Sequence, residues 1–213
     1  MIIDSSELKR RYLLRIEGAR ERQVYIGPQI VALEISNACS VNCQYCSSNR
    51  SPDNPHHSRK GLFLPWKRFL TVIRDCVGLH VDEIHLTGAG EPTTHPLFRN
   101  MMRHLEQQPL TVSLFTNGTF PLDYCEDVIK GDCVVIDMSA LNRRQYRELQ
   151  GQDLFDRVAQ NIERLVYLRD TVKPGFRIEM AYILNAVNIN QKRKIRKMAA
   201  QLGINVSVRP IHL

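Results

Sequence analysis

The chain has 213 residues, of which 43% are hydrophobic and 24% charged, an ordinary composition for one globular domain with a substantial core. No apolar run approaches the ~20 residues that span a bilayer, and the N-terminal stretch mixes both charge signs without the apolar segment of a secretory signal. The composition therefore argues against a membrane protein and a secreted one, and we expect a cytoplasmic, reducing location.

The net charge of +7 favours an anionic partner, although charge alone discriminates poorly among classes of anion. The most basic stretch is residues 192–197. Within and just after it, the apolar residues Ile195, Met198 and Ala199 recur at helical spacing, so the basic residues are typical of the solvated face of a helix. No RNA-binding sequence pattern is present. We expect a small-molecule partner with some preference for anions, and neither nucleic acid nor a membrane.

Apolar, β-rich runs alternate with amphipathic segments along the chain, after an expected first helix at 6–18. The strands are predicted at 30–36, 83–87, 111–116, 133–139, 177–184 and 205–210. The helices are predicted near 64–78, 96–107, 122–130, 155–172 and 190–202, the last ended by Gly203. This alternation implies parallel strands joined by crossover helices. An open six-unit barrel fits the pattern, and so does a doubly wound sheet; in either, function gathers at the carboxyl ends of the strands.

Directly after the first predicted strand, Cys39, Cys43 and Cys46 form a C-x3-C-x2-C pattern. Iron–sulfur clusters are held by cysteine thiolates, normally four of them. A cluster held by three protein thiolates has one iron free to bind another molecule, and catalytic metal sites in general keep an open position. The pattern therefore predicts a cluster site for chemistry.

Two other interpretations of the cysteines stay open. A zinc ion held with His56 or His57 as the fourth ligand is the first, and burial of the cysteines on one helix face is the second. The helix face does not continue, since Ser36 and Arg50 flank it, and the intervening residues favour a loop. We favour the cluster over zinc, and zinc over core packing. Outside the pattern, Cys76, Cys125 and Cys133 are scattered without metal-ligand spacing, and Cys76 and Cys133 lie in apolar contexts and are most simply buried residues.

Three turns are expected at the same edge as the cysteines. After the second strand, Gly88, Ala89 and Gly90 let a ligand approach the backbone, and Glu91 adds a carboxylate, so this turn is suited to an ammonium group. A plain tight turn is the alternative. The third and fourth strands are followed by polar residues that include Asn117 and Ser139.

Together these residues resemble the radical S-adenosylmethionine (SAM) superfamily. CSVNCQYC matches its cysteine pattern with an aromatic before the third cysteine, TGAGEPTTHP resembles its GGEP motif, and TNGT resembles its third-strand motif. The stretch SALNRRQYRELQGQDLFDRVAQNIERL resembles a fourth βα unit frequent in its members. The resemblance covers about residues 31–208 and implies an α/β fold. The expected form is a partial (β/α)6 TIM-like barrel with a parallel sheet and an N-terminal helical extension, divided into an extension at 1–28 and a core at 29–213.

The resemblance implies that the three cysteines hold a 4Fe–4S cluster whose open iron binds the amino and carboxylate groups of SAM. The amino group would be received by Gly88, Ala89, Gly90 and Glu91, and backbone at Tyr45 would contact the adenine. Asn117 and Ser139 would line the ribose or carboxylate side. Reductive cleavage of SAM would give a 5′-deoxyadenosyl radical that takes hydrogen from the substrate, with electrons from an external donor of the flavodoxin or ferredoxin type. The turn carries one small residue more than GGEP, so which glycine meets the amino group is open.

The catalytic residues toward the substrate are unknown from the sequence. Alternation along the fifth strand places Arg177, Glu179 and Ala181 on one face, and if that face lines the barrel the first two are candidate substrate contacts. An internal salt-bridge layer is the equal alternative. Arg209 at the end of the sixth strand could hold an anionic group, or it could be a surface residue. The loop at 47–60 is a candidate lid, with plain disorder as the alternative.

Our hypothesis from the sequence is a radical SAM enzyme acting on a small polar metabolite, such as a sugar or nucleotide derivative. A radical SAM enzyme that modifies peptides is the main alternative, although relatives of that kind often carry a further cysteine-rich region, and none follows the sixth strand in this sequence. A non-catalytic iron–sulfur or zinc module is the alternative from a different class.

Overall fold

A computed structural model describes residues 5–46 and 61–210, and its centre is one six-stranded sheet. The strands are β1 (Ile30–Glu34), β2 (Glu83–Thr87), β3 (Thr111–Thr116), β4 (Cys133–Asp137), β5 (Arg177–Leu184) and β6 (Asn205–Pro210). All neighbours pair in parallel in the order β1-β2-β3-β4-β5-β6. β1 and β6 do not pair with each other in this order, so the curved sheet is open and the predicted partial barrel is confirmed.

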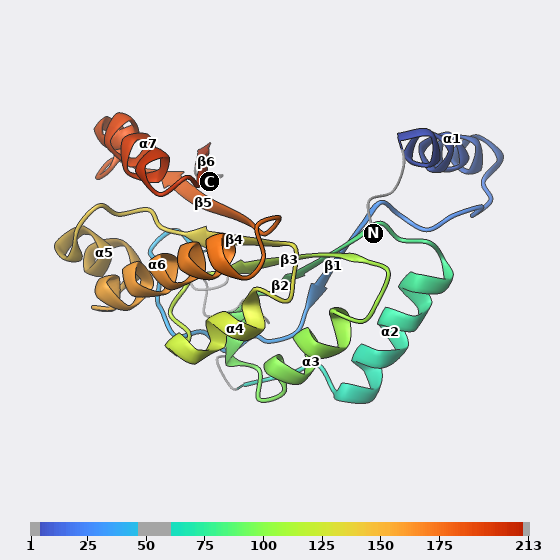
Figure 1. The fold of residues 1–213 in the computed structure, drawn as a ribbon, viewed down its shortest axis with the longest axis horizontal. Helices are drawn as coiled ribbons and strands as arrows, with labels where there is room; N and C mark the ends of the chain where they lie inside the picture. The colour runs from blue at the N-terminus through green and yellow to red at the C-terminus, as the bar shows by residue number, and fades with distance from the viewer. Residues whose placement is uncertain (1–4, 47–60, 211–213) are drawn as a thin grey trace.

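The helices that connect the strands cover one face of this sheet (Figure 1). They are α2 (Trp66–Gly78), α3 (Phe98–Leu105), α4 (Cys125–Val128), α5 (Arg143–Gln150), α6 (Phe155–Thr171) and α7 (Lys192–Gln201). Three short 3-10 turns accompany them: η3 (Pro92–Thr94), η4 (Leu122–Tyr124) and η5 (Ile189–Gln191). Each connection between consecutive strands contains at least one of these helices, with both α5 and α6 between β4 and β5, so the crossover pattern predicted from the sequence is correct.

The hydrophobic core lies between the sheet and these helices. Alternate strand residues, among them Ile84, Val134 and Met180, point into it and are at most 1% exposed. The residues between them face the other, concave side, where Cys133, Val135 and Ala181 form a small buried apolar cluster with Phe115 packed against it. Polar and charged residues share this side with exposed apolar ones such as Ile30 and Ala32.

Helix α1 (Ser5–Glu21) stands apart from the helical layer (Figure 1). Arg11 and Arg15 of α1 reach Asp82, just before β2, at 2.8 and 2.9 Å, and Arg15 also donates to the Gly27 carbonyl at 2.8 Å. These contacts fasten α1 near the amino ends of the strands, which is the opposite edge from the cysteines. Across residues 5–46 and 61–210, no helix combines the length and apolarity needed to cross a bilayer.

The structure changes several predicted boundaries. β1 and β4 end at Glu34 and Asp137, two residues earlier than predicted, because the chain turns into the loops of the site. The helix predicted at 122–130 is a 3-10 turn followed by a short α-helix. Helix α5 was not predicted as a separate element. Asn142 accepts from the Gln145 backbone N–H and caps its start, and Gly151 in the left-handed region ends it, so both signals were present in the sequence.

Candidate metal and cofactor site

The three cysteines lie on a loop at the carboxyl edge of the sheet, where the sequence placed them. Cys39, Cys43 and Cys46 are all partly buried. The loop is held by the end of α5, because the backbone N–H groups of Asn42 and Gln44 donate to the carbonyls of Gln150 and Leu149 at 2.8 and 2.9 Å. The loop therefore depends on a helix more than a hundred residues later in the chain.

The turn after β2 packs against the start of the same loop. The Gly90 N–H donates to the Ser36 carbonyl at 3.1 Å, and the Glu91 N–H donates to the Ala38 carbonyl at 2.7 Å. A Cβ on Gly90 would lie 2.2 Å from the Ala38 oxygen, and one on Gly88 would lie 2.6 Å from the Ser36 oxygen. The small residues thus have a structural reason that the sequence did not reveal: they admit a neighbouring backbone of the same chain.

Glu91 is 2% exposed, and its carboxylate is directed into the protein. One oxygen accepts from the Thr93 N–H at 3.1 Å, the Thr93 hydroxyl at 2.6 Å and the Thr116 hydroxyl at 2.7 Å. The other accepts from the Asn117 N–H at 2.7 Å. Burial raises the pKa of Glu91, and these hydrogen bonds oppose the shift. The geometry makes Glu91 a link between the turns after β2 and β3, and its predicted contact with an amino group stays a prediction.

Asn117 connects the turn after β3 to the cysteine loop. Its side-chain Nδ2 donates to the Ser40 hydroxyl at 3.1 Å and to Cys39 Sγ at 3.6 Å. Its Oδ1 accepts from the Thr119 N–H and hydroxyl at 3.0 and 2.7 Å. With 8% of its surface exposed, Asn117 has its amide directed toward a cysteine sulfur.

Beyond the end of β4, Ser139 is fully buried and lies between two strands. Its hydroxyl donates to Asp137 Oδ1 at 2.7 Å and accepts from the Ile183 N–H at 2.9 Å. Asp137 Oδ2 in turn accepts from the Tyr45 hydroxyl at 2.9 Å. Burial, the largest cause, raises the pKa of Asp137. The residue of this strand end that reaches the cysteine loop is therefore Asp137, and Ser139 supports it.

The Tyr45 hydroxyl also accepts from Gln150 Nε2 at 2.9 Å, and the Cys43 thiol donates to Gln150 Oε1. Desolvation raises the pKa of Tyr45 and of Cys43, and the nearby charge of Asp137 adds to both shifts. Desolvation also raises the pKa of Cys39. Without a bound metal, Cys39 and Cys43 are therefore protonated near neutral pH.

The donor set fits an iron–sulfur cluster. Within residues 5–46 and 61–210, no three His, Cys, Asp or Glu side chains lie close enough to hold a single metal ion. A four-iron cluster is wider than an ion, so its ligands lie farther apart, and three soft thiols on one loop are the ligands that it takes. His56 and His57, and the loop at 47–60 considered as a lid or as disorder, lie outside the described residues, so the zinc alternative stays open.

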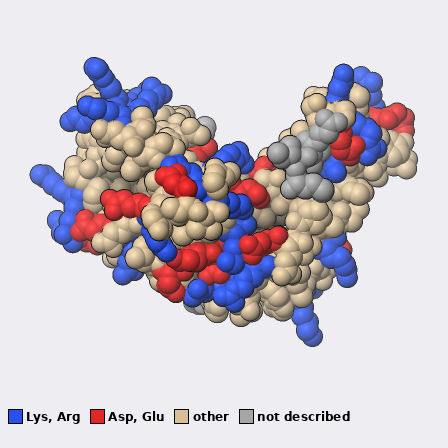
Figure 2. Space-filling model, viewed as in Figure 1, with Lys and Arg blue, Asp and Glu red and all other residues tan. Residues whose placement is uncertain are grey.

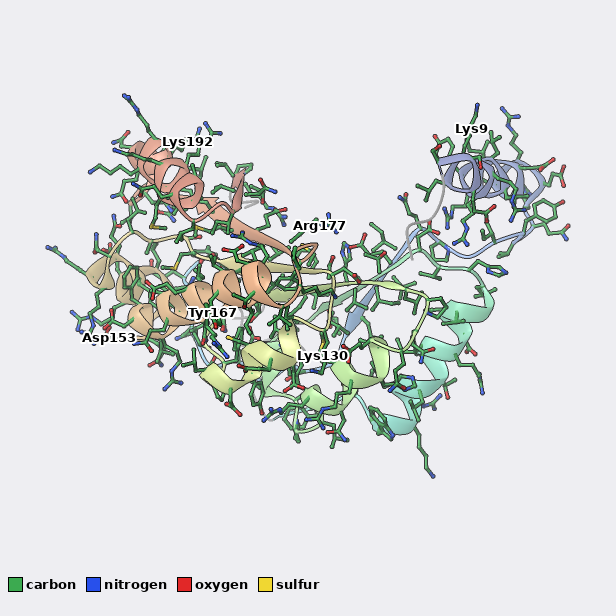
Figure 3. All side chains as sticks on the ribbon, in the orientation of Figure 1. Lys9, Lys130, Asp153, Tyr167, Arg177 and Lys192 are labelled. Carbon is green, nitrogen blue, oxygen red and sulfur yellow. The ribbon has the colours of Figure 1, made fainter. Side chains whose placement is uncertain are left out.

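The concave face carries the residues predicted to meet a substrate. Arg177, Glu179 and Ala181 share this face, as predicted, and Arg177 lies at the start of β5 on the side away from α3 and α4 (Figure 3). Arg209 of β6 forms an ion pair with Glu179 at 3.6 Å, and both side chains are partly exposed, so this pair is not the internal salt-bridge layer considered for Arg177 and Glu179. The substrate contacts stay a prediction. Figure 2 shows the molecule hollowed between the part that carries α7 and the part that carries α1.

Sequence reasoning missed three residues that shape the site: Asp137, Gln150 and Asn161. Asn161 of α6 is fully buried and donates from Nδ2 to the carbonyls of Gly118 and Phe120, both at 2.8 Å. The available signal was a polar side chain on an otherwise apolar face, in Asp137 at the end of a strand and in Asn161 within a helix. Gln150, next to the helix-ending Gly151, gave no comparable signal.

A family model described as the radical SAM superfamily matches residues 33–170 of the chain. Among curated proteins, the chain is 26% identical over 183 residues to the tungsten-containing aldehyde ferredoxin oxidoreductase cofactor-modifying protein of Pyrococcus furiosus, covering 81% of this chain and 48% of that protein. It is 27% identical over 143 residues to a probable GTP 3',8-cyclase of Pyrococcus abyssi, covering 66% and 44%. The chain thus spans about half the length of the curated relatives that it matches.

Solved structures share the fold. Streptococcus suis SuiB superimposes with a TM-score of 0.72 at 18% identity, covering 100% of this chain and 47% of that chain. Native anSMEcpe, solved with bound AdoMet and the Cp18Cys peptide, gives a TM-score of 0.65 at 14% identity, covering 85% and 50%. At these identities the likeness concerns the fold alone, and it agrees with an open, parallel (β/α)6 arrangement.

Proposed function

The chain belongs to the radical SAM superfamily, and from this membership we propose that it is an enzyme that reductively cleaves S-adenosylmethionine and abstracts hydrogen from a small polar substrate. In this proposal Cys39, Cys43 and Cys46 hold a 4Fe–4S cluster. The bound cluster and SAM supply the radical chemistry, and the protein supplies binding, orientation and exclusion of water. The proposed catalytic core is 29–213, with 1–28 as an extension.

The observation that carries this proposal is the set of hydrogen bonds that joins the cysteine loop to the carboxyl ends of three different strands. Asn117 reaches Cys39 from β3, Tyr45 reaches Asp137 at β4, and the Glu91 backbone reaches Ala38 from β2. A loop that merely held a structural metal would not need this common edge. Function in sheets of this class gathers there.

For SAM itself, we propose that the backbone carbonyls of the half-buried turn at 88–90 receive the amino group, with backbone at Tyr45 against the adenine. Asn117, Glu91 and Ser139 are mainly positioning residues in this arrangement, since their polar atoms are bonded within the chain. Direct contact of Asn117 with the ribose or carboxylate side remains part of the proposal.

For the substrate, we propose a sugar or nucleotide derivative. The concave face offers both charge signs at the Glu179–Arg209 pair, and Arg177 lies exposed beside it. A curated relative is named as a probable GTP 3',8-cyclase, which supports a nucleotide for this chain. We further propose a cytoplasmic setting and an external electron donor of the flavodoxin or ferredoxin type.

The test is anaerobic reconstitution with iron and sulfide, followed by reduction with dithionite in the presence of SAM. We expect four irons per chain, and 5′-deoxyadenosine detected by mass spectrometry, in wild type and in Cys76→Ala, which removes a buried cysteine outside the loop. Replacing Cys39, Cys43 or Cys46 by Ala should abolish both the iron content and the formation of 5′-deoxyadenosine. A protein that loads zinc, or that loads a cluster without cleaving SAM, would refute the proposal. Nucleotides, sugars and peptides added to the active protein then identify the substrate class by loss of the added compound.

A further inference from the structure

A chain of four side chains joins Cys43 to the end of β4. The Cys43 thiol donates to Gln150 Oε1, Gln150 Nε2 donates to the Tyr45 hydroxyl at 2.9 Å, and that hydroxyl donates to Asp137 Oδ2 at 2.9 Å. Gln150 is fully buried, so water does not replace its contacts. Its side chain is thus the direct neighbour of one of the three cysteine sulfurs.

The direction of the first bond must change when Cys43 binds a metal. A ligating cysteine is a thiolate, which accepts hydrogen bonds and donates none. A glutamine amide carries an acceptor at one end and two N–H donors at the other, and half a turn of its plane exchanges them. In the turned state the Tyr45 hydroxyl would donate to Gln150 Oε1 instead of to Asp137 Oδ2, and Asp137 would keep the hydrogen bond from the Ser139 hydroxyl at 2.7 Å. The surroundings of Gln150 therefore permit the turned amide.

We propose that Gln150 is a positioning residue that turns its Nε2 toward Cys43 in the cluster-bound protein and thereby raises the reduction potential of the cluster. Hydrogen bonds to cluster sulfurs are one of the factors that set this potential. A donor stabilises the reduced cluster more than the oxidised one, because the reduced cluster carries more negative charge. Asn117 Nδ2, 3.6 Å from Cys39 Sγ, already has this direction toward a second ligand. The inference rests on the proposed function, since it requires the cluster.

A purely structural role for Gln150 is separable from this one. The backbone carbonyl of Gln150 accepts from the Asn42 N–H at 2.8 Å, and any residue at this position keeps that bond. Gln150→Met keeps the approximate side-chain volume and loses the amide. Gln150→Glu keeps the shape and replaces the N–H donors with acceptors when ionised. Gln160→Met, on the exposed side of α6, is the matched control.

The experiment is reconstitution of each full-length variant, measurement of iron content, and a reductive titration followed by electron paramagnetic resonance. Loss of the donor should lower the reduced-to-oxidised ratio at a given potential by about tenfold, which is a shift of about 59 mV for a one-electron couple. We expect this shift in Gln150→Met, a larger one in Gln150→Glu, and none in Gln160→Met.

If Gln150→Met and Gln150→Glu both assemble the full cluster and keep the reduction potential and spectrum of wild type, the inference is overturned and the proposed function is left intact. If Gln150→Met fails to load, the isosteric Gln150→Glu decides by the same criterion. Failure of wild type to assemble a cluster would instead refute the proposed function, and this inference with it.

Discussion

Replacing Glu91 by glutamine tests whether its carboxylate holds the site together. Each oxygen accepts from one backbone N–H, that of Thr93 at 3.1 Å or that of Asn117 at 2.7 Å. Gln has a single acceptor oxygen, so in either amide orientation one of these buried N–H groups faces an NH2 group. The Thr93 and Thr116 hydroxyls can turn and accept, but a backbone N–H cannot.

The magnitude follows from these contacts. A buried donor without a partner costs about 1–3 kcal/mol, and loss of a charge-assisted hydrogen bond costs about 1.5–3 kcal/mol. Removing the buried charge also removes its desolvation cost, which offsets part of the loss. We therefore expect Glu91→Gln to lower the free energy of unfolding by about 2–3 kcal/mol in the absence of any ligand.

Urea unfolding of the metal-free protein measures this difference, provided that the transition is two-state. Glu106→Gln makes the same chemical change at an exposed position and should alter stability by less than about 0.5 kcal/mol. If Glu91→Gln is as stable as wild type but binds SAM weakly, the carboxylate acts on the ligand rather than on the turns, and our reasoning about it is wrong.

Three further changes test the surrounding structure. Gly90→Ala places a Cβ 2.2 Å from the Ala38 oxygen, so we expect the free energy of unfolding measured in urea to fall by about 1–3 kcal/mol and iron loading to be reduced. Gly78→Ala, where the same atom meets nothing within 4 Å, should not destabilise, and equal behaviour of the two would refute the packing argument. Asn161→Ala leaves two buried carbonyls without their donor, and should cost about 2–4 kcal/mol by the same measurement; a loss below about 1 kcal/mol would contradict this role. Burial lowers the pKa of His95, whose Nδ1 accepts from the Leu97 N–H. The unfolded chain therefore binds the proton more readily, and stability should fall as pH drops below about 6.5 toward the lowered folded pKa. His95→Gln should remove this part of the pH profile, while His80→Asn at an exposed position should retain it.

The sequence predicted the sheet well because each strand is an apolar run between clear breakers. All six strands were placed, with β1 and β4 drawn two residues too long, and the cysteine loop lies at the predicted edge. Local pattern is enough for this, since periodicity and turn residues act within a few positions.

The connections within the site could not be predicted in the same way. Which side chain meets Cys43 depends on how α5 is placed against a loop far earlier in the chain, and neither Gln150 nor Asp137 shows its partner in its sequence neighbourhood. The two glycines at 88 and 90 were correctly recognised as permitting close approach, but the approaching group in the structure is the chain's own backbone. Long-range contacts of this kind follow from packing rather than from local propensity.

The dependence of the cysteine loop on α5 also sets an order of events during synthesis. Cys43 and Gln150 are 107 positions apart, and the backbone bonds from Asn42 and Gln44 reach the same helix end. At translation rates of about 5–20 residues per second, all three cysteines leave the ribosome several seconds before the segment that shapes their loop. During that interval the thiols belong to a nascent chain whose metal-binding geometry is not yet formed. Iron delivered at that stage meets flexible ligands, so productive loading should begin only after α5 has emerged and docked.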